Sequence, residues 1–269
     1  MNQRQKNQPA VLPTQTRSGG GLVNSGYFEL SSRPLHTLIF LLPIIAFYEI
    51  GSMGLLGSGE VAKLEAQDML VRFFDLFGTL GLHLPAFALI VILLLQHILS
   101  KDTWRIVPIV PLAMIVESAF LTWPLIILVI ILNPQASVMM IQAESGASTA
   151  HTFWEGLYLS FGAGLYEEML FRLVLITILH FLITDVLSFK DRTGKIAAVV
   201  LSALAFAWLH DGVYIPGSGL NFRLAAFYTL AGVYFGILFL MRGLGLAVGA
   251  HLMYDLLVFV VMPGIQDQS

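Results

Sequence analysis

The sequence predicts an all-α polytopic membrane protein, in which about seven transmembrane helices and one interfacial amphipathic helix enclose a polar cavity. Two observations predict this fold class. Hydrophobic residues make up 57% of the 269 residues and charged residues only 12%, with a mean hydropathy of +0.81, whereas a soluble domain carries about 25% charged residues. The apolar residues also gather in long segments. The excess apolar surface is therefore expected to face lipid.

A transmembrane helix needs roughly 20 mainly apolar residues, because its backbone groups must bond to one another across about 30 Å of hydrocarbon. Seven segments approach or exceed this length: 34–56, 79–99, 106–132, 153–183, 195–209, 222–241 and 244–261. Between the first two, residues 61–78 carry apolar side chains near helical spacing, which indicates an interfacial amphipathic helix or, equally, a surface helix packed on the bundle. We expect three parts: a polar tail (1–33), N-terminal transmembrane helices with the amphipathic helix (34–151) and a C-terminal core (152–262).

Composition also excludes several classes of function. The absence of cysteine excludes a disulfide framework, a thiolate zinc site, an iron–sulfur cluster and a cysteine nucleophile. A net charge of −3 gives no case for a nucleic-acid partner. The polar tail lacks the apolar region of a cleaved signal peptide, so the first apolar segment is expected to be a retained span.

The distribution of Lys and Arg in the loops predicts the orientation, because such residues accumulate in cytoplasmic loops. We expect the protein to lie in the cell (inner) membrane with its N-terminus in the cytoplasm. In this orientation ten Lys and Arg residues face the cytoplasm and three face the other side. The ten are Arg4, Lys6, Arg17, Arg33, Lys101, Arg105, Lys190, Arg192, Lys195 and Arg242; the three are Lys63, Arg72 and Arg223. The loop 133–151 contains neither residue type, as expected of an exported loop.

Two glutamates lie inside the fourth apolar segment. An ionisable group is costly there, so it is expected either to pair with another group or to have a function. Glu168 and Arg172 are four residues apart, in the order that favours an ion pair on one helix face. Glu167 points about 100° away and has no local cation, which suits a general base. Gly162 and Gly164, one turn earlier, are expected to leave room for water or a substrate backbone. The alternative is a buried ion pair that only stabilises helix packing.

Two further segments carry polar pairs at the same spacing. Phe206 and His210 end the fifth segment, and His251 and Asp255 lie within the last. Each pair shares a helix face. Alone, either histidine suits a satisfied core or packing residue. The remaining histidines are read as interfacial: His36, His83, His97, His151 and His180.

Together these residues form a combination that is more specific than any member, because helix packing can bring them into one cavity. Two chemistries fit. In one, Glu167 and His210 deprotonate a water molecule, and His251 and Asp255 stabilise an oxyanion. In the other, Glu167, His210 and His251 ligate a divalent metal such as zinc, which generates the hydroxide. No HExxH motif and no serine in a GxSxG turn is present.

The order of these motifs resembles the CAAX-protease and bacteriocin-processing (CPBP) family of intramembrane endopeptidases, which includes the type II CAAX prenyl endopeptidases. The segments GLYEEMLFR, FAWLH and HLMYD match the motifs EExxxR, FxxxH and HxxxN/D. The resemblance covers about 152–261; the earlier spans match only in being hydrophobic. It implies a membrane-embedded protease acting on protein or peptide tails, lipid-modified in the prenyl processors, with or without a metal.

Carried over to this sequence, the resemblance implies a role for each motif residue. Glu167 would be the catalytic base and His210 its partner on the water. His251 and Asp255 would form the oxyanion site, and Glu168, Arg172 and Phe206 would support the others. The prenyl processors carry Asn at the last position. Since an ionised Asp255 would repel an oxyanion, it must be protonated, orient His251 or ligate a metal.

Some alternatives stay open at this point. At 1.5 Å per residue, Glu167 and His210 lie roughly 25 Å from the cytoplasmic ends of their helices. A peptide in the cytoplasm reaches residues at this depth only if the helices tilt and unwind. Otherwise the cavity opens outward or the topology is inverted. A non-catalytic immunity or scaffold factor that retains the motifs is the main alternative function. A proton-coupled transporter is disfavoured, because the two halves show no paired discontinuous segments.

Overall fold

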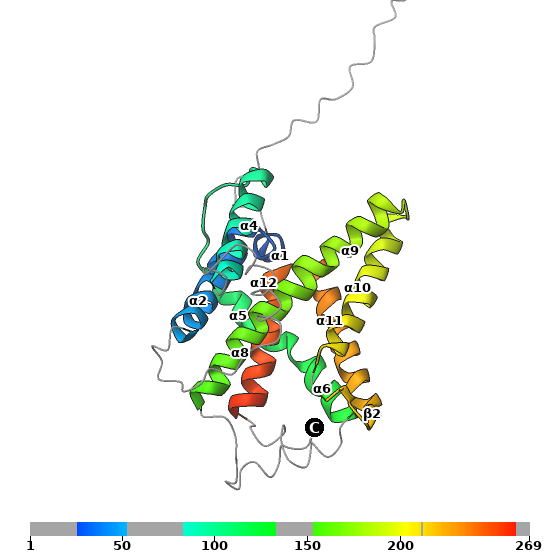
Figure 1. Ribbon diagram of the computed structural model, residues 1–269. Coiled ribbons are helices and arrows are strands. Elements are labelled where there is room, and N and C mark those ends of the chain that lie inside the picture. The colour runs from blue at the N-terminus through cyan, green and yellow to red at the C-terminus, as the bar shows by residue number, and fades with distance from the viewer. Residues whose placement is uncertain (1–25, 53–82, 133–152, 211, 262–269) are drawn as a thin grey trace, which may run out of the picture.

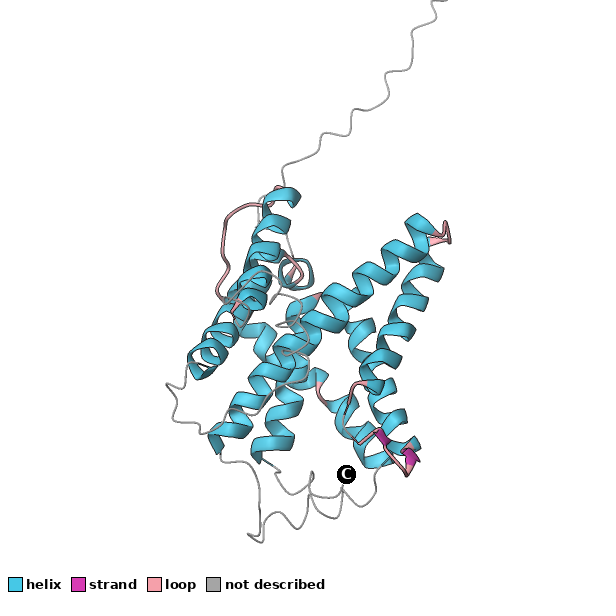
Figure 2. Ribbon diagram, viewed as in Figure 1, coloured by secondary structure: helices cyan, strands magenta, loops and turns pink. Residues whose placement is uncertain are grey.

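The computed structural model describes residues 26–52, 83–132, 153–210 and 212–261, and these segments form a bundle of helices (Figures 1 and 2). The N-terminal half contains α1 (Tyr27–Ser31), α2 (Pro34–Ser52), α4 (Leu84–Ser100), α5 (Ile109–Leu121) and α6 (Trp123–Leu132). The C-terminal half contains α8 (Phe153–Glu168), η4 (Met169–Ile176), α9 (Thr177–Phe181), η5 (Leu182–Val186), α10 (Asp191–Trp208), β1 (Tyr214–Ile215), β2 (Gly219–Leu220), α11 (Phe222–Arg242), α12 (Leu244–Asp255) and η6 (Leu256–Val261).

Within these residues, four helical stretches are long and apolar enough to cross a membrane: Pro34–Gly51, Ile109–Leu132, Gly156–Val186 and Phe222–Arg242. Leu84–Ser100 and Leu244–Val258 are shorter apolar helices. The predicted segment 195–209 corresponds to α10, which begins four residues earlier, at the polar residue Asp191, and ends at Trp208. The predicted helical class is confirmed in that the described residues are mostly helical, with one small two-stranded hairpin. The count of seven spans and the polar cavity stay predictions. The amphipathic segment 61–78 and the loop 133–151 lie outside the described residues.

Local sequence explains several helix ends. Asn221 caps α11, where its side chain accepts a hydrogen bond from the Leu224 backbone N–H. Gly243 separates α11 from α12 with a φ of +83°, a conformation that favours glycine. Thr122 stands at the junction of α5 and α6 and donates its hydroxyl hydrogen bond to Ser118 O at 3.0 Å. These breaks let one chain reverse or bend between packed helices.

Helix α12 is the centre of the bundle. From Leu244 to Leu252 all its side chains are buried, as expected of a helix that other helices surround. Its small residues permit this packing, because a Cβ at Gly245 would lie 2.8 Å from the Met114 side chain of α5. The core around it combines fully buried side chains of α2, α4, α5, α8 and α12, among them Leu41, Leu89, Met114, Leu165 and Leu246. His251 is therefore held on a rigid element.

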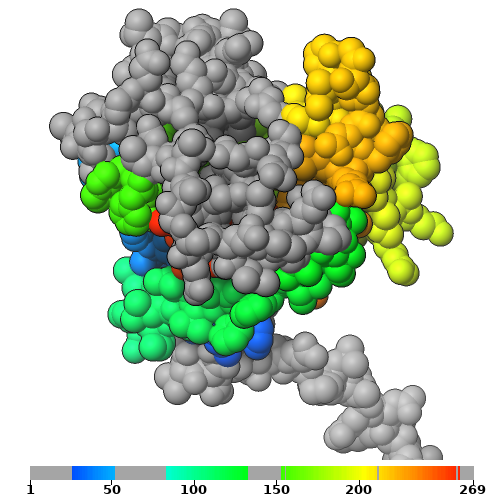
Figure 3. Space-filling view, turned by 90° about the horizontal axis from the view of Figure 1, so that it is seen from below, coloured from blue at the N-terminus to red at the C-terminus, as the bar shows by residue number. Residues whose placement is uncertain are grey.

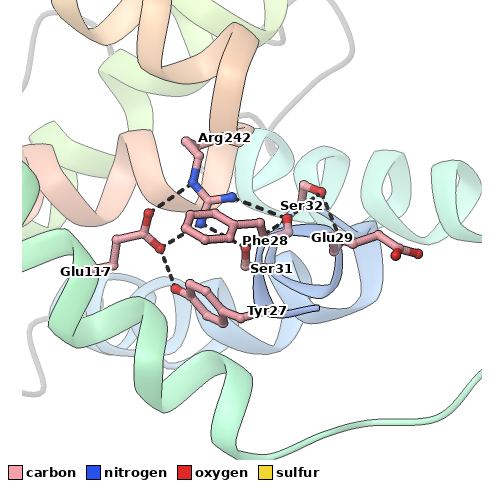
Figure 4. A network of polar contacts seen from close by, with 7 residues as sticks. All are labelled: Tyr27, Phe28, Glu29, Ser31, Ser32, Glu117 and Arg242. Atoms are coloured by element: carbon pink, nitrogen blue, oxygen red, sulfur yellow. Dashed lines mark hydrogen bonds and ion pairs between the residues drawn. The ribbon is translucent and has the colours of Figure 1, made fainter. Parts of the chain in front are cut away.

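A network of polar contacts joins α1, α5 and the end of α11 (Figure 4). Arg242 donates from Nε to Glu117 Oε1 at 3.0 Å and from Nη2 to Glu117 Oε2 at 2.7 Å. It also donates to Ser31 Oγ and to the Phe28 carbonyl, while the Tyr27 hydroxyl donates to Glu117 Oε2. We call these five residues the Arg242 clasp; it anchors the short α1 helix to the bundle.

Candidate active site

Glu167, His210 and His251 converge from three helices. Glu167 lies one residue before the end of α8, His210 follows the last turn of α10, and His251 lies within α12. Glu167 Oε2 is 3.6 Å from His210 Nε2 and 3.7 Å from His251 Nε2. The structure thus brings together the three side chains at the centre of the predicted site. Their catalytic roles stay predictions.

These separations exceed the 2.7–3.2 Å range of an N–H···O hydrogen bond and suit a bridging water. Glu167 Oε2 is buried and has no hydrogen-bond partner within the protein. The same holds for Asp255 Oδ2, which is 3.5 Å from His251 Nε2. A buried acceptor without a partner costs free energy. Two such carboxylate oxygens therefore lie beside two imidazole nitrogens, where a water molecule would supply the missing hydrogen bonds.

His210 is oriented from two sides. Its Nδ1 donates to the Phe206 carbonyl oxygen at 2.6 Å, so Nε2 is the nitrogen that faces Glu167. The ring lies against Phe206, with centroids 4.3 Å apart, as its spacing in the sequence predicts. It also stacks on Tyr228 of α11, with centroids 3.9 Å apart. The imidazole is thus held in one plane with one nitrogen directed at the carboxylate.

His251 is oriented by the second glutamate. Its Nδ1 donates to Glu168 Oε1 at 2.7 Å, and its ring stacks on Phe235 of α11 at 4.7 Å. Glu168 also pairs with Arg172, Nη1 to Oε1, at 3.1 Å, and both side chains are almost fully buried. The predicted Glu168–Arg172 pair is confirmed. The fold adds that this pair holds the histidine whose Nε2 faces Glu167.

The guanidinium of Arg172 lies among aromatic rings. Its Cζ is 4.3 Å from the ring centroid of Phe206 and 5.2 Å from that of Phe235. Such contacts stabilise a buried cation that one carboxylate alone neutralises. Phe206 therefore contacts both the supporting arginine and His210, which gives a physical reason for an aromatic residue four positions before that histidine.

The charges of the site are not balanced by side-chain pairing alone. Three carboxylates share this buried volume with a single guanidinium. Isolated buried charges are strongly disfavoured, so this surplus of carboxylates requires compensation beyond Arg172. Asp255 lies next to His251, with Oδ2 3.5 Å from Nε2. Its three predicted roles, as a neutral acid, as the group that orients His251 or as a metal ligand, stay predictions.

The sequence did not single out the aromatic residues of α11 that stack on both histidines. Tyr228 and Phe235 are seven residues apart, so they lie on one face of α11 after two turns. Gly232, between them, lets α11 approach α10, because a Cβ there would lie 2.8 Å from Ala203 Cα. Aromatic residues at helical spacing resemble ordinary core, so no pattern could have marked them.

One expectation about the surroundings was wrong. Gly164 does not leave room for water or substrate, because a Cβ there would lie 2.9 Å from the Leu252 backbone nitrogen; this glycine lets α8 pack against α12. His36 and His97 are buried within the bundle, and their position at the membrane interface stays a prediction. His36 Nε2 accepts a hydrogen bond from the Val107 N–H, a contact between residues distant in the sequence.

A further polar group escaped sequence reasoning. Glu49 of α2 accepts a hydrogen bond from the Tyr166 hydroxyl at 2.7 Å and pairs with His83. Tyr166 is adjacent to Glu167 in the chain but points toward α2 and not toward the site. This contact fixes the last turn of α8, and with it the position from which Glu167 projects.

In the described segments, no group of three or more His, Asp or Glu side chains is arranged to hold a metal ion. Glu167, His210 and His251 are close to one another without such an arrangement. The metal-free and the metal-dependent chemistry both stay predictions, which treatment with a chelator would distinguish.

Comparison with known proteins identifies the C-terminal part of the chain. Residues 149–257 match the family model described as type II CAAX prenyl endopeptidase Rce1-like. No curated protein and no solved structure matches the chain. The matched region contains every residue of the candidate site. The family is one of CAAX-type proteases, which act on peptides, and the apolar helices make the chain an integral membrane protein. Residues 149–257 of this chain therefore belong to the Rce1-like family of type II CAAX prenyl endopeptidases.

Proposed function

We propose that this protein is an intramembrane endopeptidase that hydrolyses a peptide bond with a water molecule activated by Glu167 and His210. The observation that carries the proposal is the position of Glu167 Oε2. This buried oxygen has no hydrogen-bond partner in the protein and lies 3.6 and 3.7 Å from two imidazole nitrogens. A carboxylate held among histidines at water-bridging distance is the geometry of a general base.

In the proposed reaction, a water held between Glu167 Oε2 and His210 Nε2 transfers a proton to the carboxylate as its oxygen attacks the carbonyl carbon of the scissile bond. The carbonyl π electrons move to the oxygen and form a tetrahedral oxyanion. The oxyanion electron pair then re-forms the carbonyl as the carbon–nitrogen bond breaks, and the proton on Glu167 passes to the leaving amine. The second proton of the water stays on the new carboxyl group, and Glu167 returns to its ionised state.

His251 and Asp255 support the opposite side of this intermediate. Glu168 accepts a hydrogen bond from His251 Nδ1, which favours a second proton on Nε2, where it donates to the oxyanion. Asp255 Oδ2, 3.5 Å from the same nitrogen, either shares that proton or, as a neutral acid, donates a hydrogen bond as Asn would. Glu168 and Arg172 then act as positioning residues.

The proposed substrate is a peptide tail held at the membrane, with a lipid-modified tail of the CAAX type as the first to test. This proposal rests on the family match. The membrane lipid is the medium that presents such a tail to a site within the bundle.

The test is incubation of purified protein with a prenylated CAAX-type peptide and its unmodified counterpart. Glu167→Gln is expected to lower cleavage by about 10²–10⁴-fold, the contribution of a general base. Glu117→Gln is the matched control, because it changes another carboxylate within an apolar helix, far from the site, and should retain cleavage. Retained cleavage in Glu167→Gln would contradict the mechanism. Loss of activity with a chelator, restored by zinc, would favour the metal-dependent chemistry.

A further inference from the structure

The connection between α10 and α11 is a small hairpin with an apolar, exposed surface. Strands β1 and β2 pair in antiparallel register, with Tyr214 opposite Leu220. Trp208 at the end of α10 stacks on Tyr214 with centroids 5.7 Å apart, although both rings are more than half exposed. Phe222, which follows the hairpin, is 78% exposed. Figure 3 shows this part of the chain, yellow to orange, at the surface of the molecule.

This surface continues the lipid-facing side of α10. Leu201 and Leu204 are exposed and lie on the same helix face as Trp208, at spacings of three and four residues. At the tip of the hairpin Pro216, Gly217 and Ser218 are exposed, and Ser218 supplies a polar side chain there. Aromatic side chains at the end of an apolar helix face are typical of the membrane–water interface.

The hairpin and α1 lie at opposite ends of one transmembrane helix. Helix α11 begins after the hairpin at Phe222 and ends at Arg242, a length of about 30 Å at 1.5 Å per residue. Arg242 contacts Phe28 and Ser31 of α1. The length of α11 thus matches the thickness of a hydrocarbon core. In Figure 1, β2 and α1 lie toward opposite ends of α11.

Positive charge is distributed unequally between these two ends. Seven of the described Lys and Arg residues lie at the end that carries α1 or at the turn before α10, and Arg223 lies at the hairpin end. The seven are Arg33, Lys101, Arg105, Lys190, Arg192, Lys195 and Arg242. Because Lys and Arg accumulate on the cytoplasmic side, this distribution places the hairpin at the opposite face.

His210, the site residue that precedes the hairpin in the chain, is the most exposed of the site residues. Its side chain, four residues before β1, is 20% exposed; Glu167 is 14%, Asp255 8%, His251 7% and Glu168 0% exposed. His210 also stacks on Tyr228, six residues or about 9 Å from the hairpin end of α11. The described part of the site is thus most accessible at His210.

We propose that the α10–α11 hairpin is an interfacial anchor that lies among the phospholipid headgroups of the membrane face opposite α1, and that it holds the His210 end of the site at that face. The occupant of its apolar surface is the bilayer interface.

The absence of cysteine from the chain permits a direct test that does not depend on activity. Ser218→Cys in the hairpin turn and Ser32→Cys after α1 are both at exposed positions. In right-side-out vesicles, a membrane-impermeant maleimide is expected to label Ser218→Cys at once and Ser32→Cys only after permeabilisation. Labelling of both positions at once, or of Ser32→Cys alone, would overturn the proposal.

The anchor itself is tested by lipid quenching in proteoliposomes of a phosphatidylcholine and phosphatidylglycerol mixture. An environment-sensitive fluorophore on Ile215→Cys, in β1, is expected to be quenched more by nitroxide lipids with a shallow label than with a deep one. The same fluorophore on Ser218→Cys, three residues away in the turn, is the matched control and should be quenched less by both. An Ile215→Cys probe that neither lipid quenches would place the hairpin in water and refute the anchor. Cleavage assays on the same proteoliposomes report separately on the peptidase activity.

Discussion

The bundle contains two clusters of charged residues that differ in how their polar atoms are used. In the Arg242 clasp, Glu117 receives two hydrogen bonds from the guanidinium and one from Tyr27, and Arg242 also binds Ser31. In the candidate site, Glu167 Oε2 and Asp255 Oδ2 are buried without a hydrogen-bond partner. Both clusters place carboxylates among apolar helices, yet only one is saturated.

This difference separates a structural role from a chemical one. In the clasp, both carboxylate oxygens already accept hydrogen bonds from protein groups. The ion pair therefore stabilises the packing of α1, α5 and α11 and leaves no acceptor for a reactant. An unsaturated carboxylate in a buried position is retained at a cost in stability, which a function explains. Substitutions in the clasp should therefore lower the free energy of unfolding without changing the cleavage rate. Substitution of Glu167 should lower the cleavage rate without lowering the free energy of unfolding.

The largest effect on stability is expected within the site, at Glu168 and not at Glu167. Glu168→Ala leaves Arg172 as a buried charge without its carboxylate, which costs about 3–5 kcal/mol. Denaturation in detergent measures this loss. Glu29→Ala is the control, because Glu29 and Arg33 form an ion pair of the same helical spacing at an exposed position; it should change stability by about 0.5 kcal/mol or less. Equal effects of both variants would show that burial of the pair is unimportant.

A smaller loss of stability is expected from opening the clasp. Arg242→Ala removes the hydrogen bonds to Glu117 and Ser31, and it should lower the free energy of unfolding by about 1–3 kcal/mol, because the pair is partly exposed. Cleavage per folded molecule should stay unchanged. A loss of activity without a loss of stability would remove the distinction between the two clusters.

Phe206→Leu tests the link between the arginine and His210. Leucine preserves burial but removes the ring that lies against Arg172 and His210. We expect about a tenfold decrease in kcat with little change in KM, since a misplaced His210 slows the activation of the water more than it weakens substrate binding. Phe171→Leu, which removes another ring near Arg172 but none beside His210, is the comparison. If both variants lose the same activity, general packing and not orientation of His210 is responsible.

The smallest effect is expected at Tyr27. Burial and the hydrogen bond to Glu117 raise the pKa of the Tyr27 hydroxyl above its ordinary value of 10.0. The folded state therefore disfavours ionisation, and its stabilisation is complete below pH 10.0 and is lost as the pH rises toward the folded-state pKa. Tyr27→Phe should cost about 1 kcal/mol at neutral pH and should flatten the decline of stability above pH 10. An unchanged alkaline decline would assign it to other groups.

Part of the site could be predicted from the sequence because the α-helix is a local structure. Residues four apart share a helix face wherever the helix packs, so the pairs Glu168–Arg172 and Phe206–His210 follow from the spacing alone. The membrane class followed from composition, because only apolar helices of sufficient length satisfy their backbone groups in hydrocarbon. The three motifs were also sufficient to identify the family that the comparison confirms.

The tertiary structure decided everything that depends on how the helices pack. No local period predicts that Glu167 meets His210 and His251 from two other helices, that α11 supplies the rings stacked on both histidines, or that Arg242 reaches Glu117. It also decided which glycines are packing contacts and which histidines are buried. The physical reason is that side-chain direction repeats along one helix and is set by the helix itself. The approach of two helices depends on the shapes of all the side chains between them.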